Sequence, residues 1–359
     1  MITTYLAFVL SFLIAFIASP ITIFLSKKFN LVDDPDKRPH PAHIQNRIIP
    51  RAGGLPVYIA ILITLLLFIP ITKSLIGILA GITVLLIVGL LDDKFANFSP
   101  FPRLGFQLLA ALIVVLSGVG ITFITNPFGG ILHLDMINIP ISFWGEHNLL
   151  LVADLFALIW ITWIMNVVNW SKGVDGQMPG VMTIAFIVIG IISFRFFMQG
   201  DPNQLSIAVI SFTTAGAALG LLVFNWHPAK ILPAFSGSTI LGFMLAVLAI
   251  LSGGKLATAL IVLLVPATDF FYTFFRRLYN KKSPFYGDQK HLHHLLLQRG
   301  WSHPQITLFY IGCSTVLGFL VLNLNSQEKL FTLITGTVII TGIIIWLQLF
   351  YFPKAKTKK

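Results

Sequence analysis

The chain has 359 residues, of which 56% are apolar and only 10% are charged. An ordinary soluble domain carries roughly 25% charged residues. A chain of this composition cannot cover a water-facing surface, so a soluble globular enzyme, a disordered regulator and a disulfide scaffold are all excluded. The net charge of +11 is large for so few charges, and the positions of these charges are therefore informative.

Long apolar stretches follow one another along the chain, and a bilayer core needs about 20 apolar residues per helix. The stretches are 3–25, 54–72, 75–91, 104–125, 149–168, 180–198, 204–224, 239–252, 256–275, 305–324 and 330–352. Basic residues follow the first stretch and no small-residue cleavage site does, which argues against a signal peptide. We expect an all-α integral membrane protein of about eleven transmembrane helices, forming a single domain over residues 1–359.

The distribution of Lys and Arg predicts the orientation of these helices. With the amino terminus outside and the carboxyl terminus cytoplasmic, 20 of the 24 basic residues fall in cytoplasmic segments and 3 in external ones, with Arg195 inside a span. The one long external segment, 126–147, contains an alternating run from Ile131 to Ile141. This alternation predicts a small external β-hairpin.

Residues capable of chemistry gather in the predicted cytoplasmic segments. A transporter would instead place ionisable residues or broken helices near the bilayer midplane, where this chain has few candidates. The distribution favours an enzyme whose site opens on the cytoplasmic face.

The first of these segments, 33–54, mixes an acidic cluster with basic residues and ends in Gly53-Gly54 at the start of a predicted helix. Helix amino termini bind anions readily. Asp92 and Asp93 then close the third apolar stretch in the pattern Gly89-Leu-Leu-Asp-Asp. An adjacent carboxylate pair suits Mg²⁺, which commonly takes one or two carboxylates together with substrate phosphates. The alternative is a polar helix end that marks the interface.

Two further segments carry polar clusters. Asn166 and Asn169 are spaced to share a helix face, and Lys172-Gly-Val-Asp175-Gly follows them in a loop whose glycines can expose backbone N–H groups to phosphate. In the longest basic loop, Asp288 precedes His291-Leu-His293-His294. These histidines could contact phosphate or sugar, shuttle protons, bind zinc, or belong to an ordinary interfacial loop.

In their joint order these segments resemble the polyprenyl-phosphate N-acetylhexosamine-1-phosphate transferase family, the polytopic phosphoglycosyltransferases of glycosyltransferase family 4. The matching patterns run from Asp33 to Gly300. They are Asp33/Asp34-Pro35 to His40 with Pro50-Arg51-Ala-Gly-Gly54, Gly89 to Asp93, Arg103 to Gln107, Asn166 to Gly176, Asn225 to Lys230, Asp269 with Arg276-Arg277, and Pro284-Phe285 with Asp288 and His291 to His294.

The resemblance implies transfer of N-acetylhexosamine-1-phosphate, with N-acetylglucosamine favoured, from a UDP-sugar to undecaprenyl or another polyprenyl phosphate. UMP is released, and the product begins a cell-envelope glycopolymer. The implied location is the bacterial inner or plasma membrane, with a cytoplasmic active site. Membrane lipids are expected partners and nucleic acid is not, while the choice between monomer and homodimer stays open. A catalytically degenerate binder of lipid phosphate or nucleotide sugar is the alternative, followed by a lipid or sugar-phosphate transporter.

The resemblance also assigns roles to residues. The catalytic residues are Asp92, Asp93, His291, His293 and His294. The substrate-binding residues are Arg51, Arg103, Asn166, Asn169, Lys172, Asp175 and Asn225. The metal ligands are Asp92, Asp93 and Asn169, for Mg²⁺ or Mn²⁺.

Two positions depart from the family pattern. Lys172 replaces the first Asp of D-G-x-D-G, and Phe235 stands where the family has a metal-binding Asp. Because Phe cannot bind Mg²⁺, the metal site is expected to be weakened or rearranged. We hypothesise that Lys172 partly replaces the cation as a point charge near the pyrophosphate.

Overall fold

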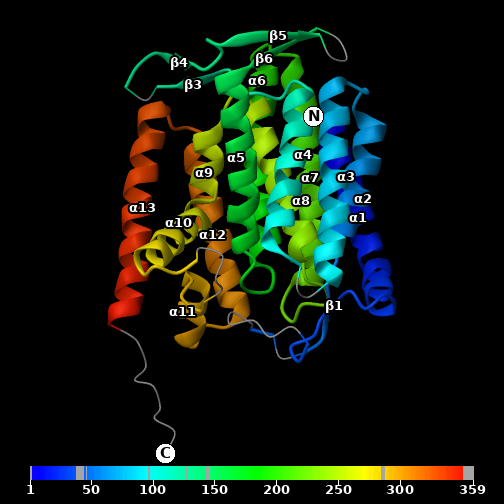
Figure 1. Cartoon of the computed structure of the whole chain (residues 1–359), viewed down its shortest axis with the longest axis vertical. Helices are drawn as coiled ribbons and strands as arrows, with labels where there is room; N and C mark the ends of the chain where they lie inside the picture. Colours follow the sequence, from blue (N-terminus) through cyan, green and yellow to red (C-terminus); the bar gives the residue numbers. More distant parts are fainter. Residues whose placement is uncertain are drawn as a thin grey trace, which may run out of the picture.

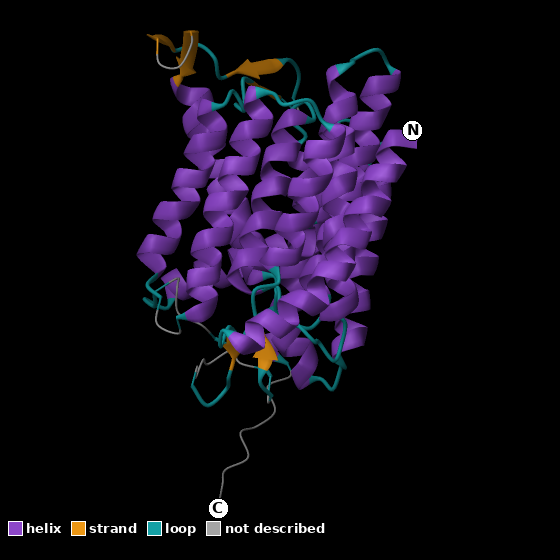
Figure 2. Ribbon diagram, turned by 90° about the vertical axis from the view of Figure 1, so that its right-hand side faces the viewer, coloured by secondary structure: helices purple, strands orange, loops and turns teal. Residues whose placement is uncertain are grey.

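A computed structural model describes residues 2–37, 44–45, 47–95, 98–126, 128–142, 146–283 and 288–350, with the side chains of 140–149 left out. The predicted pattern residues at 38–43 and 284–287, and the basic tail at 351–359, lie outside the described residues. Most of the chain folds into one bundle of helices that run roughly side by side (Figures 1 and 2).

Helices make up nearly all of the bundle. They are α1 (Ile2–Lys28), α2 (Gly54–Phe68), α3 (Lys73–Lys94), α4 (Pro100–Leu116), α5 (Leu151–Trp170), α6 (Gln177–Met198), α7 (Asn203–Asn225), α8 (Ala234–Leu251), α9 (Leu256–Val262), α10 (Leu264–Tyr279), α11 (Leu292–Gln298), α12 (His303–Val321) and α13 (Ser326–Leu349). Each of the predicted apolar stretches overlaps one of these helices or, for 256–275, the pair α9 and α10. The all-α prediction is confirmed.

Membrane crossing is supported by length and composition. Among the described residues, eight helices are long and apolar enough to span a bilayer, or nine if the bent α9–α10 pair is one span. The apolar helices α2 and α4 are shorter. The chain is therefore a multi-pass membrane protein, and the expected count of eleven spans stays a prediction.

Burial separates the centre of the bundle from its periphery. The apolar window of α8 is 94% buried, whereas that of α13 is only 11% buried. A helix that is apolar on all sides is stable either inside a protein core or against lipid. Their burial places α8 at the centre of the bundle and α13 at the lipid-facing edge.

Within the described residues, six short strands pair as three separate antiparallel ribbons. The strands are β1 (Val32–Asp33) with β2 (Ile49–Pro50), β3 (Phe123–Thr125) with β4 (Ile131–His133), and β5 (Asn138–Ser142) with β6 (Glu146–Leu150). The alternating run from Ile131 to Ile141 thus contributes to two hairpins, not to one continuous strand. These two hairpins cover the end of the bundle opposite β1 (Figure 1).

The ninth apolar stretch is broken by an 87° bend between α9 and α10. Pro266 lacks the N–H that would otherwise donate to the carbonyl of Val262, which weakens the helix at this point. Ser314 Oγ of α12 donates to that carbonyl at 2.9 Å. The bend turns α10 away from the axis of α9 and toward the end of the bundle where α11 lies (Figure 1). This helix carries Asp269, Arg276 and Arg277.

Candidate active site

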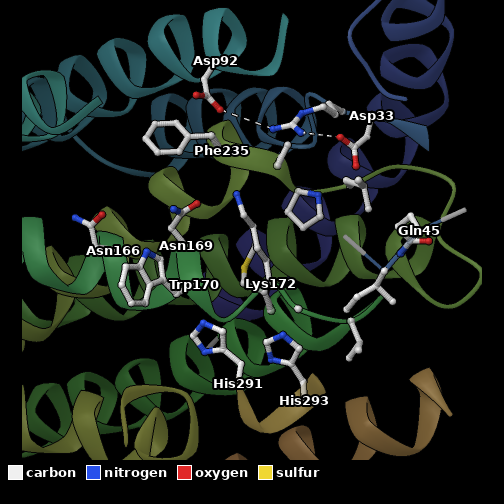
Figure 3. A pocket seen from close by; sticks show the side chains of 18 of the residues that line it. Asp33, Gln45, Asp92, Asn166, Asn169, Trp170, Lys172, Phe235, His291 and His293 are labelled. Carbon is white, nitrogen blue, oxygen red and sulfur yellow. Dashed lines mark hydrogen bonds and ion pairs between the residues drawn. The ribbon is translucent and has the colours of Figure 1, made fainter. Parts of the chain in front are cut away.

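A cavity of about 710 Å³ opens at this end of the bundle. It is lined by residues from the β2–α2, α3, α4, α5–α6, α7–α8, α10 and α11 regions. Every predicted site residue except Asp93 lines it: Arg51, Asp92, Arg103, Asn166, Asn169, Lys172, Asp175, Asn225, His291, His293 and His294. The fold therefore joins motifs that are far apart in the sequence (Figure 3).

Asp93 is fully buried behind the cavity wall. Its Oδ1 accepts hydrogen bonds from the Phe235 N–H at 3.1 Å and from Arg51, and its Oδ2 accepts one from Ser236 Oγ at 2.7 Å. Phe235 and Ser236 lie in the first turn of α8, whose backbone N–H groups have no partners within the helix. Asp93 thus ties the end of α3 to the start of α8, and both of its oxygens are already used.

Asp92 faces the cavity and is surrounded by arginines. Arg103 forms an ion pair with its Oδ1, and Arg51 Nη2 lies 3.7 Å from its Oδ2. Arg51 also contacts Asp93 and, at 3.1 Å, Asp33, which the β1–β2 pairing brings beside it. Arg51 and Arg103 are therefore committed to carboxylates.

Lys172 extends into the cavity from the α5–α6 loop (Figure 3). Within the described residues, no carboxylate forms an ion pair with it, and its ammonium lies 6.0 Å from the centre of the Phe235 ring. The loop passes close to α11, because a Cβ at Gly173 would lie 2.2 Å from the His293 ring. Only glycine fits at this contact, which fixes where Lys172 enters the site.

The pKa of Lys172 is lowered to about 8. The main cause is burial among protein atoms, and the charge of Arg51 adds to it, while Asp92 and Asp93 act in the opposite direction. Part of the side chain nevertheless remains accessible from the cavity. The ammonium is thus desolvated and unpaired, which leaves it ready to bind an anion.

The predicted histidines lie across the cavity from Asp92 (Figure 3). His291 Nδ1 is 2.8 Å from Asp269 Oδ2, and Asp269 Oδ1 accepts the Leu292 N–H at 2.9 Å, so the ring of His291 is held from α10. Burial lowers the pKa of His293 well below its usual value, and the neighbouring histidines add to the effect. The uncharged imidazole of His293 is therefore favoured at pH 7, so this side chain does not serve as a cation.

A second arginine pair stands beside the histidines. Arg276 and Arg277 both bind Asp288, with Oδ2 distances of 2.9 and 3.2 Å. Burial opposes ionisation of Asp288, but the Lys290 N–H and the two arginines lower the pKa of its carboxyl. Arg277 also stacks over Trp170, 4.9 Å from its centre.

The predicted amide residues hold the cavity wall together. Asn166 donates to Gln107 at 3.0 Å, and Asn169 Oδ1 accepts from Ser238 of α8 at 2.8 Å. Asn225 accepts the Gly176 N–H at 2.9 Å and donates to the Ile231 carbonyl at 2.8 Å. These contacts fix the two loops that precede α6 and α8.

Asp175 is held from several sides at once. Its Oδ1 accepts from Gln45 at 2.7 Å, and its Oδ2 accepts the Ala229 N–H at 3.1 Å and contacts His227. Sequence reasoning gave no role to Gln45, Trp170, His227 or His303. The nearest signal was the position of His227 inside the Asn225 to Lys230 pattern.

The donor atoms present fit a magnesium ion poorly. Asp93 has no oxygen to spare, Asn169 already accepts from Ser238, and Phe235 offers no ligand. Asp92, the other carboxylate among the predicted ligands, is paired with Arg103. Mg²⁺ demands near-octahedral oxygen ligands, and guanidinium groups stand where such an ion would have to bind.

The amino-acid sequence is similar to those of known proteins. The family model described as Glycosyl transferase family 4 matches residues 75–253. A decaprenyl-phosphate N-acetylglucosaminephosphotransferase from Mycobacterium tuberculosis H37Rv is 30% identical over 292 residues, which cover 72% of this chain and 68% of that protein. The chain belongs to glycosyl transferase family 4.

Other members of the family match at greater length. A probable undecaprenyl-phosphate N-acetylglucosaminyl 1-phosphate transferase from Bacillus subtilis is 28% identical over 358 residues, covering 97% of this chain and 91% of the relative. An undecaprenyl-phosphate alpha-N-acetylglucosaminyl 1-phosphate transferase from Escherichia coli K12 is 28% identical over 295 residues, covering 78% and 73%. Membership of this family makes the chain a transferase, as its sequence motifs predict.

Proposed function

We propose that this family 4 member transfers N-acetylglucosamine-1-phosphate from a UDP-sugar to a polyprenyl phosphate and releases UMP, thereby beginning a bacterial cell-envelope glycopolymer. The names of the relatives support this function over a degenerate binder or a transporter. The structural observation that supports it best is the unpaired, desolvated ammonium of Lys172 inside a cavity of about 710 Å³. Ligand pockets commonly measure about 300–1,000 Å³.

The reaction is a phosphoryl transfer. A terminal oxygen of the lipid phosphate attacks the phosphorus that carries the sugar, and the bond from that phosphorus to the bridging oxygen breaks. UMP leaves with the bridging oxygen. Because little covalent chemistry falls to the protein in such transfers, positioning and charge stabilisation supply most of the catalysis.

Charge stabilisation falls to the cations that line the cavity. Both substrates are anions, and clustered positive groups reduce their mutual repulsion. Arg51, Arg103 and Arg277 already balance carboxylates, whereas Lys172 is free to bind phosphate. We propose that Lys172 binds the pyrophosphate of the donor. Its positive charge would there partly replace that of a metal ion.

Asp92 is the better placed of the two adjacent carboxylates to face the acceptor. It lines the cavity, whereas Asp93 is buried in contacts to α8. We therefore assign the positioning of the acceptor phosphate to Asp92 together with its arginines. We propose that His291, which Asp269 orients, and the neutral His293 contact the donor substrate from the opposite wall of the cavity.

The orientation of the protein follows from the same proposal. We place the cavity at the cytoplasmic face of the plasma membrane, where a soluble nucleotide-sugar meets a lipid-borne acceptor. The last turns of α1 and α10 carry the basic residues Lys27, Lys28, Arg276 and Arg277. Basic residues are in excess on cytoplasmic segments of membrane proteins, which supports this placement.

The test is UMP release by the purified protein in nanodiscs supplied with UDP-N-acetylglucosamine and undecaprenyl phosphate. We expect UMP only when both substrates are present, and a loss of at least about 100-fold in Asp92→Asn, comparable to removal of one charge-stabilising group at an active site. Wild-type protein that folds but releases no UMP, with or without added Mg²⁺ or Mn²⁺, would refute the transferase assignment.

The metal requirement is tested in the same assay. Because the donor set fits Mg²⁺ poorly, we expect excess EDTA to reduce the rate less than Lys172→Ala does. Complete dependence on added Mg²⁺, together with an unimpaired Lys172→Ala variant, would show that the metal and not the lysine carries the charge.

A further inference from the structure

A second group of side chains able to bind a metal ion lies at the edge of the cavity and shares one lining residue, Asp175, with it. It consists of Asp175, His227 and His303. His227 Nδ1 lies 2.8 Å and His303 Nδ1 3.8 Å from the same oxygen, Asp175 Oδ2. Each residue offers one ligand atom, and all three atoms lie within 4.8 Å of one another.

The cluster joins three segments that are distant in the sequence. Asp175 belongs to the loop before α6, His227 to the loop after α7, and His303 to the first turn of α12, where Ser302 caps the helix. Thr307 of α12 donates to the Asp175 carbonyl at 2.6 Å, which fixes α12 against the same loop. The backbone therefore holds the three side chains together without any ion.

The ligand atoms are arranged for a shared partner. The two imidazoles stack with centres 4.5 Å apart, and the Nδ1 atom of each lies within 4 Å of Asp175 Oδ2. Among the described residues, His303 Nδ1 is buried and has no hydrogen-bond partner. Asp175 is oriented by Gln45 and by the Ala229 N–H, as carboxylates that bind metals usually are by neighbouring groups.

We propose that Asp175, His227 and His303 bind one divalent transition-metal ion of the zinc class through Oδ2 and the two Nδ1 atoms. Two imidazoles and one carboxylate suit Zn²⁺ or Co²⁺ better than Mg²⁺ or Ca²⁺, which prefer oxygen ligands. A water molecule completes a four-coordinate site. Binding displaces the proton that His227 Nδ1 shares with Asp175, and this proton goes to solvent.

The side chain of His227 is 39% exposed, which gives the ion a path from the aqueous side. Arg47 is the nearby cation, and its guanidinium is bound to the Ala229 carbonyl at 2.6 Å. Because the ion joins the starts of α6 and α12 to the end of α7, its binding stabilises this end of the bundle. The site requires no turnover, so the proposal goes beyond the proposed transfer and stands or falls separately from it.

The experiment uses the full-length protein in detergent, purified with an affinity tag that contains no histidine and stripped of metal with EDTA. Co²⁺ is titrated in, its visible absorption reports tetrahedral nitrogen and oxygen ligation, and Zn²⁺ is then added as a competitor. We expect one tight equivalent of Co²⁺ per chain, displaced by Zn²⁺, with a Zn²⁺-dependent rise in melting temperature.

Variants locate the bound ion. His303→Ala and His227→Ala should each weaken binding by more than about tenfold, and Gln45→Ala by about tenfold through loss of its support of Asp175. The controls are His133→Ala, at an exposed histidine of β4, and His291→Ala, which removes the histidine held by Asp269 in the active-site cavity.

Wild-type binding no tighter than that of His303→Ala would overturn the proposal, and so would binding lost in His291→Ala instead. His303→Gln, compared by gel filtration and by its melting temperature without metal, separates loss of a ligand from loss of the fold. If the metal-free melting temperature of His303→Gln matches the wild type while Zn²⁺ still stabilises it fully, the site is refuted.

Discussion

At Lys172 the chain carries a largely desolvated positive charge that forms no ion pair within the described residues, although Asp92 and Asp93 attract it from a distance. Such a charge costs free energy in the empty protein, because burial removes it from water. A phosphate group in the cavity would restore the lost interaction. This free-energy cost indicates that Lys172 serves to bind an anion and does not stabilise the fold.

The charge of Lys172 makes substrate capture depend on pH. Since its pKa is about 8, kcat/KM for the UDP-sugar should fall as pH rises through about 8, where the free enzyme loses the ammonium. In Lys172→Arg the fall should move to higher pH, because a guanidinium stays protonated. The pH profile of initial rates checks this, with Lys230→Arg at an exposed lysine as the control. An unchanged profile in Lys172→Arg would contradict the assignment.

The two adjacent carboxylates should separate by phenotype. Asp93→Asn removes the negative charge that pairs with Arg51 and replaces one of the two acceptor oxygens with an NH₂ donor, so we expect the protein to lose about 3 kcal/mol of stability, as when a buried ion pair loses one partner. Asp92→Asn also loses an ion pair with Arg103, which is partly open to the cavity, so it should lower the melting temperature less than Asp93→Asn while abolishing activity. Thermal unfolding of both variants, with Asp201→Asn at an exposed aspartate as the control, distinguishes them. Equal melting temperatures for Asp93→Asn and the wild type would reject the structural role.

Sequence motifs predicted the composition of the site better than the role of each residue. Ionisable residues at the ends of apolar stretches must gather at the bilayer surface, which is why Arg51, Asp92 and His291 were found. Whether Asp92 or Asp93 points into the cavity depends on the rotation of α3 against α8. That rotation is set by packing, and the sequence pattern does not specify it.

At the level of elements, the contact between α3 and α8 positions both carboxylates. A Cβ at Gly89 would lie 2.4 Å from Ser236 Cα, so the two helices approach each other at this glycine. We expect Gly89→Ala to destabilise the protein by about 1–3 kcal/mol through overpacking and to reduce activity. Gly105→Ala on α4 is the matched control, because nothing lies within 4 Å of its Cβ position. Thermal unfolding measures both, and equal effects would contradict the close approach.

The bend in the ninth apolar stretch could not be predicted from the sequence alone. Its composition predicts one span over 256–275, and Pro266 was a visible signal of a break. At the resulting 87° bend, the hydroxyl of Ser314 in α12 donates a hydrogen bond to the Val262 carbonyl. That contact joins residues about fifty positions apart, so it could not be read from the local pattern.

For the whole molecule, the two ends of the bundle carry different structures. The β3–β4 and β5–β6 hairpins cover one end, and the cavity opens at the other (Figure 1). The amino end of α1 lies toward the hairpin end, and α13 finishes at the cavity end, which fits an odd number of crossings. The orientation predicted from the basic residues would place the cavity end in the cytoplasm, and it stays a prediction.

Cysteine labelling tests that orientation. In a Cys313→Ala background, Phe128→Cys, an exposed position in a hairpin, should react with a membrane-impermeant maleimide in intact cells. Lys230→Cys, exposed near the cavity, should react only after permeabilisation. The reverse pattern would place the cavity outside the cell and would contradict the proposed substrate access.

The chemistry itself is tested most directly by following the phosphate that links the sugar to UMP. The purified protein is given UDP-N-acetylglucosamine radiolabelled at this phosphate, together with undecaprenyl phosphate, and the lipid and aqueous phases are counted. Transfer of sugar-1-phosphate predicts that the label enters the lipid while unlabelled UMP accumulates. Label that stays in the aqueous phase as UDP, or that stays in intact donor, would contradict this account.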